Sequence, residues 1–280
     1  MFHRPLVVLA ALAALLVVPA GAFAVVPHRI VSLSPTATES LFAIGAGKQV
    51  VAVDNQSDYP KRAPRTSLSG YTPNVEAIAN YHPDLVVIEF DPGDTASGLR
   101  ALGIRVLNQS TAKDLAGAYA QIRRLGVVTG HRKTANALVK RMKKQIARAV
   151  ASAPKRRLTI YHELTPDFYS ATSSTFIGRI YKLFGLRNIA DAAEDAAGAG
   201  FPKLSAEYIL SANPQVIVLA DTRCCGQNAA AVKARPGWST ISAVRTGAIA
   251  SVDDSIASRW GPRIVQFVRA VAKTLRAVPR

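Results

Sequence analysis

Residues 74–88 read NVEAIANYHPDLVVI, and residues 205–219 read SAEYILSANPQVIVL. The second stretch matches the first at a shift of 131 residues, which places Glu207 on Glu76. Each copy predicts a short helix followed by a buried strand, because a proline and one polar residue precede four apolar residues in a row. The repeat therefore predicts two similar α/β halves rather than one continuous sheet.

The rest of the chain continues this alternation of β-rich runs and helical stretches, which is typical of parallel sheets. The expected strands are residues 29–33, 50–53, 85–88, 104–107, 158–161, 216–219 and 249–252. Residue types that favour the first positions of helices mark the expected helix starts. These starts are Ser34 with Pro35, Thr72 with Pro73, Thr111 with Asp114, Ser173 or Ser174, Ser205, and Pro262.

Residues 132–152 predict the longest helix, with Leu138, Met142 and Ile146 at helical spacing. At about 1.5 Å per residue it is roughly 30 Å long. Its many basic residues indicate either a solvated face or an anion-binding patch. We therefore expect an N-terminal lobe over residues 25–130, a bridging helix over residues 131–153 and a C-terminal lobe over residues 154–280.

The first 24 residues have the pattern of a secretory signal peptide. Arg4 precedes an apolar run over residues 6–18, and Ala22-Phe23-Ala24 has the small-x-small form of a cleavage site. The run of about 13 residues is shorter than the roughly 20 that a membrane-spanning helix needs. No cysteine follows the run, so no lipid-attachment site is expected. We expect a soluble mature protein, secreted or periplasmic, that is cleaved near Ala24.

The formal net charge is +17, and cleavage would remove Arg4 and leave +16. Such a charge favours anionic partners or anionic surfaces. The basic residues are spread widely and form no nucleic-acid-binding motif, so we expect no nucleic-acid partner. The two cysteines, Cys224 and Cys225, are adjacent and cannot join distant segments. They could form a vicinal ring, join another molecule or stay reduced.

Four stretches together resemble the iron-chelate and cobalamin class of periplasmic binding proteins. They are residues 29–39 (RIVSLSPTATE) with Gly45, residues 57–60 (SDYP), residues 73–76 with 83–86, and residues 235–238 (RPGW). The resemblance covers nearly all of residues 28–278. It implies an α/β fold of two Rossmann-like lobes bridged by one long rigid helix, the class III periplasmic-binding-protein fold, with the ligand in the cleft between the lobes.

The resemblance also implies a function. The chain would be the extracytoplasmic substrate-binding protein of an ABC importer, a monomer that captures a small molecule and delivers it to the permease. Within the class, the SDYP stretch is most similar to cobalamin-binding proteins, so a corrinoid is the expected ligand. Haem or a ferric siderophore is the alternative, because both are anionic and the chain is basic.

Members of this class dock onto the permease through one surface glutamate on each lobe, and Glu76 and Glu207 occupy the matching positions. The internal repeat supports this role independently, because it puts an acid at the same place on each half. The alternative is local: each glutamate lies near a helix start, where it complements the helix dipole by about 0.3–1 kcal/mol.

Ligands of parallel α/β sheets bind beyond the carboxyl ends of the strands. The expected ligand-binding residues in the loops at these ends are Ser34, Tyr59, Tyr71, Phe90, Asp91, His162, Tyr169, Asp221, Cys224, Cys225, Arg259 and Trp260. The aromatic side chains would offer flat apolar contact to a corrin or porphyrin, or would belong to the core.

The polar members of this set have alternatives of their own. Arg259 and its neighbour Arg263 could pair with a ligand carboxylate or phosphate, or form surface salt bridges. The cysteine pair could touch the ligand as a rigid sulfur surface, or be a reduced structural pair. His162 could reach the cleft and coordinate cobalt or iron, or be a structural histidine.

We expect neither a protein-bound metal nor a cofactor. The histidines of the mature chain, His28, His82, His131 and His162, are scattered and lack metal-ligand spacing. The sequence has no Gly-x-Ser-x-Gly elbow, no phosphate-binding loop and no His-Glu-x-x-His motif, so an enzyme is not expected. An exported hydrolase is the remote alternative.

Overall fold

The computed structural model describes residues 25–193 and 198–279. The predicted signal peptide, including its cleavage site near Ala24, lies outside these residues. No helix in the described ranges has the length and the apolar character needed to cross a membrane.

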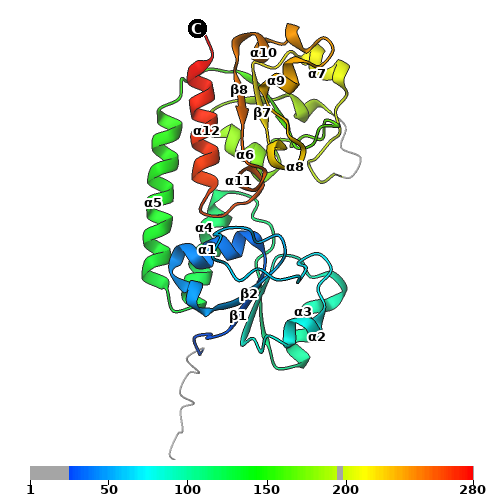
Figure 1. Ribbon diagram of the computed structural model, residues 1–280. Coiled ribbons are helices and arrows are strands. Elements are labelled where there is room, and N and C mark those ends of the chain that lie inside the picture. The colour runs from blue at the N-terminus through cyan, green and yellow to red at the C-terminus, as the bar shows by residue number, and fades with distance from the viewer. Residues whose placement is uncertain (1–24, 194–197, 280) are drawn as a thin grey trace, which may run out of the picture.

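Two four-stranded parallel sheets form the centres of two lobes, as the repeat predicted (Figure 1). The first sheet has the order β2-β1-β3-β4 and the second has the order β6-β5-β7-β8. Their strands are β1 (Ile30–Leu33), β2 (Val50–Val53), β3 (Leu85–Ile88), β4 (Arg105–Asn108), β5 (Thr159–Glu163), β6 (Arg187–Asn188), β7 (Val216–Leu219) and β8 (Ile249–Ser251). The two sheets therefore share one topology, and the expected two-lobed α/β architecture is confirmed.

The repeated sequence forms the same unit in each lobe. Helix α2 (Val75–Ala79) leads into β3, and helix α7 (Ala206–Ala212) leads into β7. Asn74 accepts a hydrogen bond from the third backbone N–H of α2, and Ser205 does the same for α7. The prediction that Thr72 starts the first of these helices was wrong. Its own N–H instead donates to the Ser69 hydroxyl, within the preceding turn.

The other helices cover the faces of the two sheets. In the first lobe they are α1 (Pro35–Ile44), α3 (Thr95–Ala101) and α4 (Leu115–Val128). In the second lobe they are α6 (Phe176–Lys182), α8 (Thr222–Cys225), α9 (Ala229–Lys233), α10 (Ser242–Thr246), α11 (Asp254–Ser258) and α12 (Ile264–Ala277). Short 3₁₀ turns cover Ala46–Gln49, Pro92–Asp94, Ile189–Ala192 and Trp238–Thr240.

Three further helix starts differ from the sequence-based expectation. Helix α12 begins at Ile264 rather than at Pro262, which lies in the turn before it. Asp114 caps α4 itself, by accepting from the Gly117 N–H, so it is not the third residue of a capping box begun by Thr111. Thr175 caps α6, in place of the expected Ser173 or Ser174, because its hydroxyl accepts from the Gly178 N–H. Ser34 caps α1 with Pro35 in its first turn, as predicted.

Helix α5 (Arg132–Ala151) bridges the two lobes. It packs against α4 and α1 of the first lobe and against α12 of the second (Figure 1). Its apolar stripe, with Leu138, Met142 and Ile146, belongs to one hydrophobic cluster that extends from Ile30 in β1 to Phe267 in α12. Because the lobes share a close-packed core, the bridge resists bending.

Helices α4 and α5 lie close together at Gly126. A Cβ on Gly126 would overlap the Cβ of Ala135 and lie 3.1 Å from the backbone oxygen of His131. We therefore expect Gly126→Ala to lower the free energy of unfolding by about 1–3 kcal/mol, although alanine is the better helix former by up to about 1 kcal/mol. Urea unfolding measures this change.

Gly117→Ala in the same helix is the matched control. Its added Cβ would meet Ala112 at 3.5 Å, an ordinary contact. The control should be as stable as the original protein or more stable. Equal stability of the two variants would contradict the close approach of α4 and α5.

Candidate ligand-binding site

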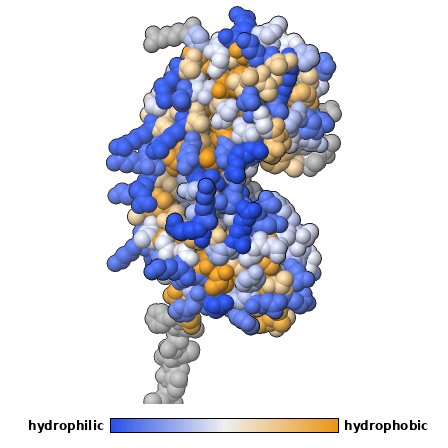
Figure 2. All heavy atoms as spheres, in the orientation of Figure 1, coloured by the Kyte–Doolittle hydropathy of each residue, from blue (hydrophilic) through white to orange (hydrophobic). Residues whose placement is uncertain are grey.

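The two lobes are separated by a hollow, which Figure 2 shows as an indentation between them. A cavity of about 240 Å³ opens in this cleft. Its lining residues from the first lobe are Leu33, Pro35, Thr36, Asp54, Gln56, Gly70, Tyr71, Glu89 and Phe90, and those from the second lobe are Asp254, Ser255, Ser258 and Arg259. The first-lobe set includes residues at the carboxyl ends of β1, β2 and β3, where parallel sheets place their ligands.

An exposed aromatic pair supplies the apolar surface of the cleft. Tyr71 and Phe90 stack with ring centroids 5.4 Å apart. Their exposed fractions are 65% and 42%. Large aromatic side chains this exposed are suited to contact a flat ligand, because a large part of each ring surface is free of other protein atoms.

Two carboxyl groups line the same cavity as the Tyr71–Phe90 pair. Asp54 follows β2 and Glu89 follows β3, and burial is the main reason that the pKa of each carboxyl is raised. Glu89 accepts a 2.6 Å hydrogen bond from the Ser34 hydroxyl. The Oδ1 atom of Asp54 is buried and has no hydrogen-bond partner among the described residues. Gly70 permits the close packing here, because a Cβ would lie 2.7 Å from the backbone oxygen of Leu33.

A buried carboxylate ties the second lobe to the first at the edge of the cleft. Glu39 of α1 is 2% exposed. Its Oε1 lies 3.1 Å from Nη1 of Arg259, and its Oε2 lies 3.0 Å from Nε of Arg263. Both arginines follow α11 in the second lobe. Glu39 therefore fixes the segment that forms one wall of the cavity.

The SDYP stretch reinforces this junction. Asp58 lies 2.8 Å from Arg259 and 3.1 Å from Arg223 of α8. Burial would raise the pKa of Asp58, but hydrogen bonds and charge from the two arginines outweigh burial and lower the pKa. The guanidinium of Arg263 lies 4.4 Å from the ring centroid of Tyr59. The stretch thus joins the lobes, and Tyr59 does not line the cavity.

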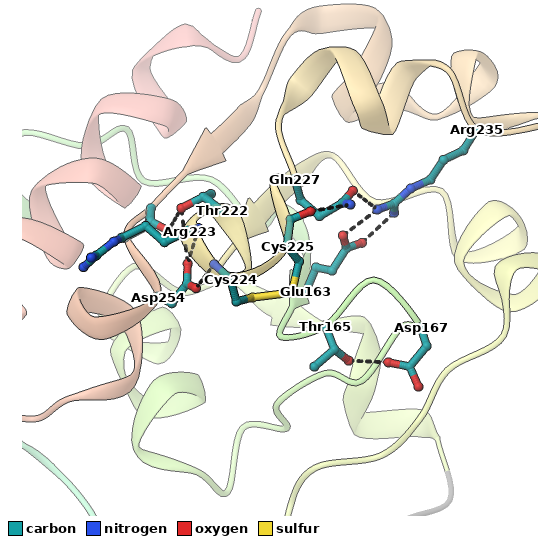
Figure 3. The surroundings of a disulfide bond; sticks show 11 residues. Glu163, Thr165, Asp167, Thr222, Arg223, Cys224, Cys225, Gln227, Arg235 and Asp254 are labelled. Atoms are coloured by element: carbon teal, nitrogen blue, oxygen red, sulfur yellow. Dashed lines mark hydrogen bonds and ion pairs between the residues drawn. A yellow bond between two sulfur atoms is a disulfide. The ribbon is translucent and has the colours of Figure 1, made fainter. Parts of the chain in front are cut away.

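The adjacent cysteines form a disulfide within α8 (Figure 3). The backbone N–H groups of Arg223 and Cys224 donate to the two carboxylate oxygens of Asp254, at 2.9 and 2.8 Å. Asp254 in turn lines the cavity. Both cysteines are exposed beside the cleft, although neither lines the cavity itself. Ligand contact by this pair remains a prediction.

Behind the disulfide lies a buried ion pair (Figure 3). Arg235 binds both carboxylate oxygens of Glu163 at 2.6 Å, and it also donates to Gln227. Asp221 is fully buried nearby, and burial followed by the negative charge of Glu163 raises the pKa of Asp221 to about 7. The prediction that Asp221 lines the cleft was wrong, because its side chain faces this buried network.

His162 is also buried rather than in the cleft. Its exposed fraction is 0%, and its Nδ1 lies 2.5 Å from the hydroxyl of Tyr181. Burial lowers the pKa of His162 to about 3, so the ring is neutral at physiological pH. The expectation that His162 reaches a ligand metal is corrected: it is a core histidine of β5. Among the described residues, no three metal-ligating side chains cluster.

Two further expected contacts belong to the protein interior. Trp260 is 7% exposed, and its Nε1 donates to Gln121 of α4 at 2.8 Å while its ring lies near Phe176 of α6. It therefore packs between the lobes. Ser34 is 1% exposed, and it caps α1 and donates to Glu89. Neither side chain lines the cavity.

Of the twelve expected ligand-binding residues, the cavity brings together Tyr71, Phe90 and Arg259. Asp91 and Tyr169 are exposed but lie outside its lining. Asp91 accepts from the Ala96 N–H in α3, and Lys203 lies over the Tyr169 ring at 5.6 Å. Ligand contact by these two residues remains a prediction.

Sequence reasoning missed most of the polar residues of the site. They are Glu39, Asp54, Gln56, Glu89 and Asp254. The rule of carboxyl-terminal strand ends could have found Asp54 and Glu89, because each directly follows a buried strand. No local signal distinguishes Glu39, because its partners lie 220 and 224 residues further along the chain.

The fold and the cleft together define a two-lobed α/β binding protein. Residues 30–256 match the family model described as periplasmic binding protein, so the chain belongs to the periplasmic binding protein family.

Two relatives and one solved structure illustrate the family. An uncharacterized ABC transporter substrate-binding lipoprotein, YvrC of Bacillus subtilis, is 31% identical over 89% of this chain and 80% of its own length. A cobalamin-binding protein of Halobacterium salinarum is 31% identical over 88% of this chain and 69% of its own. The periplasmic heme-binding protein RhuT of Roseiflexus sp. RS-1, solved in apo form, has a TM-score of 0.75 and 25% identity over 90% of this chain and 99% of that chain.

The Glu39 junction yields a stability prediction. Glu39→Gln removes the charge that balances Arg259 and Arg263, whose side chains are 14% and 12% exposed. We expect the free energy of unfolding to fall by about 3–5 kcal/mol, because Arg263 loses its ion-pair partner in a partly buried site and Arg259 keeps only Asp58. Equilibrium denaturation in urea measures the loss.

Asp167→Asn serves as the control, because it removes an ion pair with Lys203 in which both side chains are 54% exposed. Exposed pairs of this kind contribute little, so no measurable change is expected. If Glu39→Gln were as stable as this control, Glu39 would not hold the lobes together.

Proposed function

We propose that the protein is the extracytoplasmic substrate-binding protein of an ABC importer and that its ligand is a corrinoid. Membership of the periplasmic binding protein family supports this class of function, in which a small molecule is captured and delivered. The observation that carries the choice of ligand is the acceptor-rich, locally acidic cavity beside the Tyr71–Phe90 stack.

A corrinoid matches this cavity chemically. Its macrocycle is a broad flat surface for the aromatic pair, and its edge carries neutral amide groups that donate hydrogen bonds. Asp54 and Glu89 line the cavity and offer carboxylate acceptors for these groups.

Haem and ferric siderophores are disfavoured by the same charges. The carboxylates of Asp54, Glu89 and Asp254 would repel their anionic groups. Arg259 is the opposing cation in the lining, and its charge is already shared between Glu39 and Asp58. The net charge of +17 therefore does not describe the cleft, which is acidic although the chain is basic.

Haem remains the second candidate because of Tyr71. The Tyr71 side chain is 65% exposed, and a tyrosine oxygen can serve as an axial ligand of haem iron. The two candidate ligands therefore use Tyr71 differently. A corrinoid would contact the ring face, whereas haem iron would bind the hydroxyl oxygen.

Isothermal titration with cyanocobalamin, haemin and a ferric siderophore tests the proposal. We expect cyanocobalamin to bind most tightly. Tyr71→Ala should weaken its binding by about tenfold or more, because a stacked aromatic contact is worth roughly 0.5–1.5 kcal/mol beyond its buried area. Tyr71→Phe should retain the affinity, since the ring face remains.

Leu102→Ala is the control, because Leu102 is 56% exposed in the same lobe but does not line the cavity. It should bind as the original protein does. Preferential binding of haemin that is lost in Tyr71→Phe would replace the corrinoid by haem. No binding of any of the three ligands would contradict the proposal as a whole.

We further propose that Glu76 and Glu207 dock the protein onto its permease. Both side chains are exposed, and each lies in the first turn of its helix in equivalent positions of the two lobes. No salt bridge within the described residues engages either one. The two carboxylates are therefore free to meet basic residues on a partner.

The double charge reversal Glu76→Lys with Glu207→Lys should abolish ligand uptake by cells, because both contacts would become repulsive. Ligand affinity of the purified variant should be unchanged, since neither residue lines the cavity. Cellular uptake and calorimetry measure the two effects. Normal uptake by the double variant would rule out docking through these residues.

A further inference from the structure

The outer face of the bridge is strongly and uniformly basic. Seven of the 20 residues of α5 are Lys or Arg and none is acidic. Helices α4 and α12, which both pack against α5, also carry basic residues and no acidic one. The basic residues of the three helices, all exposed, are Arg123, Arg124, Arg132, Lys133, Lys140, Arg141, Lys143, Lys144, Arg148, Arg269, Lys273 and Arg276. We call this surface the basic face.

No carboxylate among the described residues neutralises the basic face. Its recorded polar contacts are to neutral groups: Arg123 donates to Asn136, and Arg276 donates to Ser152. Lys143 lies over the ring of Tyr119. Figure 2 shows hydrophilic side chains projecting along the edge where Figure 1 places α5. The charge is therefore available to an external partner.

An apolar groove opens beside the basic residues. A cavity of about 530 Å³ is lined by residues of α4 and α5, of the segment after α5 and of the segment that follows α6. Ile146, Leu183 and Phe184 contribute apolar lining, and Lys143 and Lys155 lie at the same groove. Leu183 is 42% exposed, so apolar surface is accessible from outside. Positive charge next to an apolar groove matches a molecule with an anionic head and an apolar tail.

We propose that the basic face is a docking surface for a membrane rich in anionic phospholipids. The basic side chains meet the headgroup phosphates, and the groove receives apolar lipid atoms. Basic residues near an anionic bilayer contribute additively to attraction, and this attraction falls as salt screens it. A purely polymeric anion would use the charges but would have no use for the groove.

This surface is separate from the ligand and docking sites. Figure 1 places α5 on one side of the molecule and α2 and α7, which carry Glu76 and Glu207, on the other. None of the basic-face residues lines the ligand cavity. Membrane retention can therefore be removed by mutation without changing ligand capture, and the inference does not depend on the identity of the ligand.

Co-sedimentation of the mature protein with lipid vesicles tests the proposal. We expect binding to vesicles of phosphatidylcholine mixed with phosphatidylglycerol, no binding to phosphatidylcholine alone, and release at high ionic strength. The variant Lys140→Gln, Arg141→Gln, Lys144→Gln, Arg148→Gln should bind the anionic vesicles more than about tenfold more weakly.

A matched control removes the same charge elsewhere. Arg100, Lys113, Lys233 and Arg245 are exposed and lie outside the three helices. Their fourfold change to Gln should leave most of the vesicle binding intact. An equal loss in both variants would show that net charge alone acts and would overturn the proposal.

Two further outcomes distinguish lipid from a polymeric anion. Leu183→Ser should weaken vesicle binding but not binding to dextran sulfate, because only lipid uses the groove. Binding to dextran sulfate without binding to anionic vesicles would assign the basic face to a polymer and would contradict the membrane proposal. Unfolding and ligand titrations of each variant confirm that its fold is intact.

Discussion

The carboxylate of Glu39 is the interaction on which the cleft depends. It comes from α1 of the first lobe and meets Arg259 and Arg263 of the second, in a site where its side chain is 1% exposed. Removing these charges from water is costly, and only close, well-aligned partners offset that cost. The strength of these ion pairs therefore depends on the exact placement of the carboxylate and the two guanidinium groups. The Glu39 carboxylate determines where the end of α11 and the segment after it lie, and these supply Ser258 and Arg259 to the cavity.

Helix α5 also holds the two lobes in fixed positions relative to each other. The apolar side of α5 joins α4 of one lobe to α12 of the other in a continuous core. The Asp58 ion pairs, the Trp260–Gln121 hydrogen bond and the Glu39 pairs all cross between the lobes along the same junction. A cleft held in this way is formed before the ligand arrives, so little affinity is lost to ordering the protein on binding.

Charge is partitioned between two surfaces of the molecule. The cleft concentrates Asp54, Glu89 and Asp254, whereas the outer side of α5 carries only basic charges. The net charge of +17 is a sum over the whole chain and describes neither surface. A choice of ligand based on the overall charge would therefore favour anionic haem, whereas the cavity lining carries the carboxyl groups of Asp54, Glu89 and Asp254.

The sequence predicted the architecture well because the architecture rests on local and repeated signals. The repeat over residues 74–88 and 205–219 placed β3 and β7 within one residue, and Pro35 and Gly45 bounded α1 correctly. Caps were less certain, because Thr111, Ser173 and Ser174 lie within three residues of the real caps and have similar side chains. The two-residue strand β6 and the short helices α8 and α9 were missed because they carry too few residues to show a period.

The site was less predictable, because strand-end loops contain both cleft and core residues. Tyr71, Phe90 and Arg259 line the cavity, whereas His162, Asp221 and Trp260 turn into the protein. Sequence position does not distinguish the two directions, since each depends on packing from distant elements. The same applies to Glu39, whose partners come from the other lobe.

Small-angle X-ray scattering of the protein with and without saturating cyanocobalamin tests the central claim of a preformed cleft most directly. A shared core and buried junction predict that the radius of gyration changes by less than about 1 Å on binding. A clear contraction of the whole particle, as two lobes closing about a hinge would produce, would contradict it.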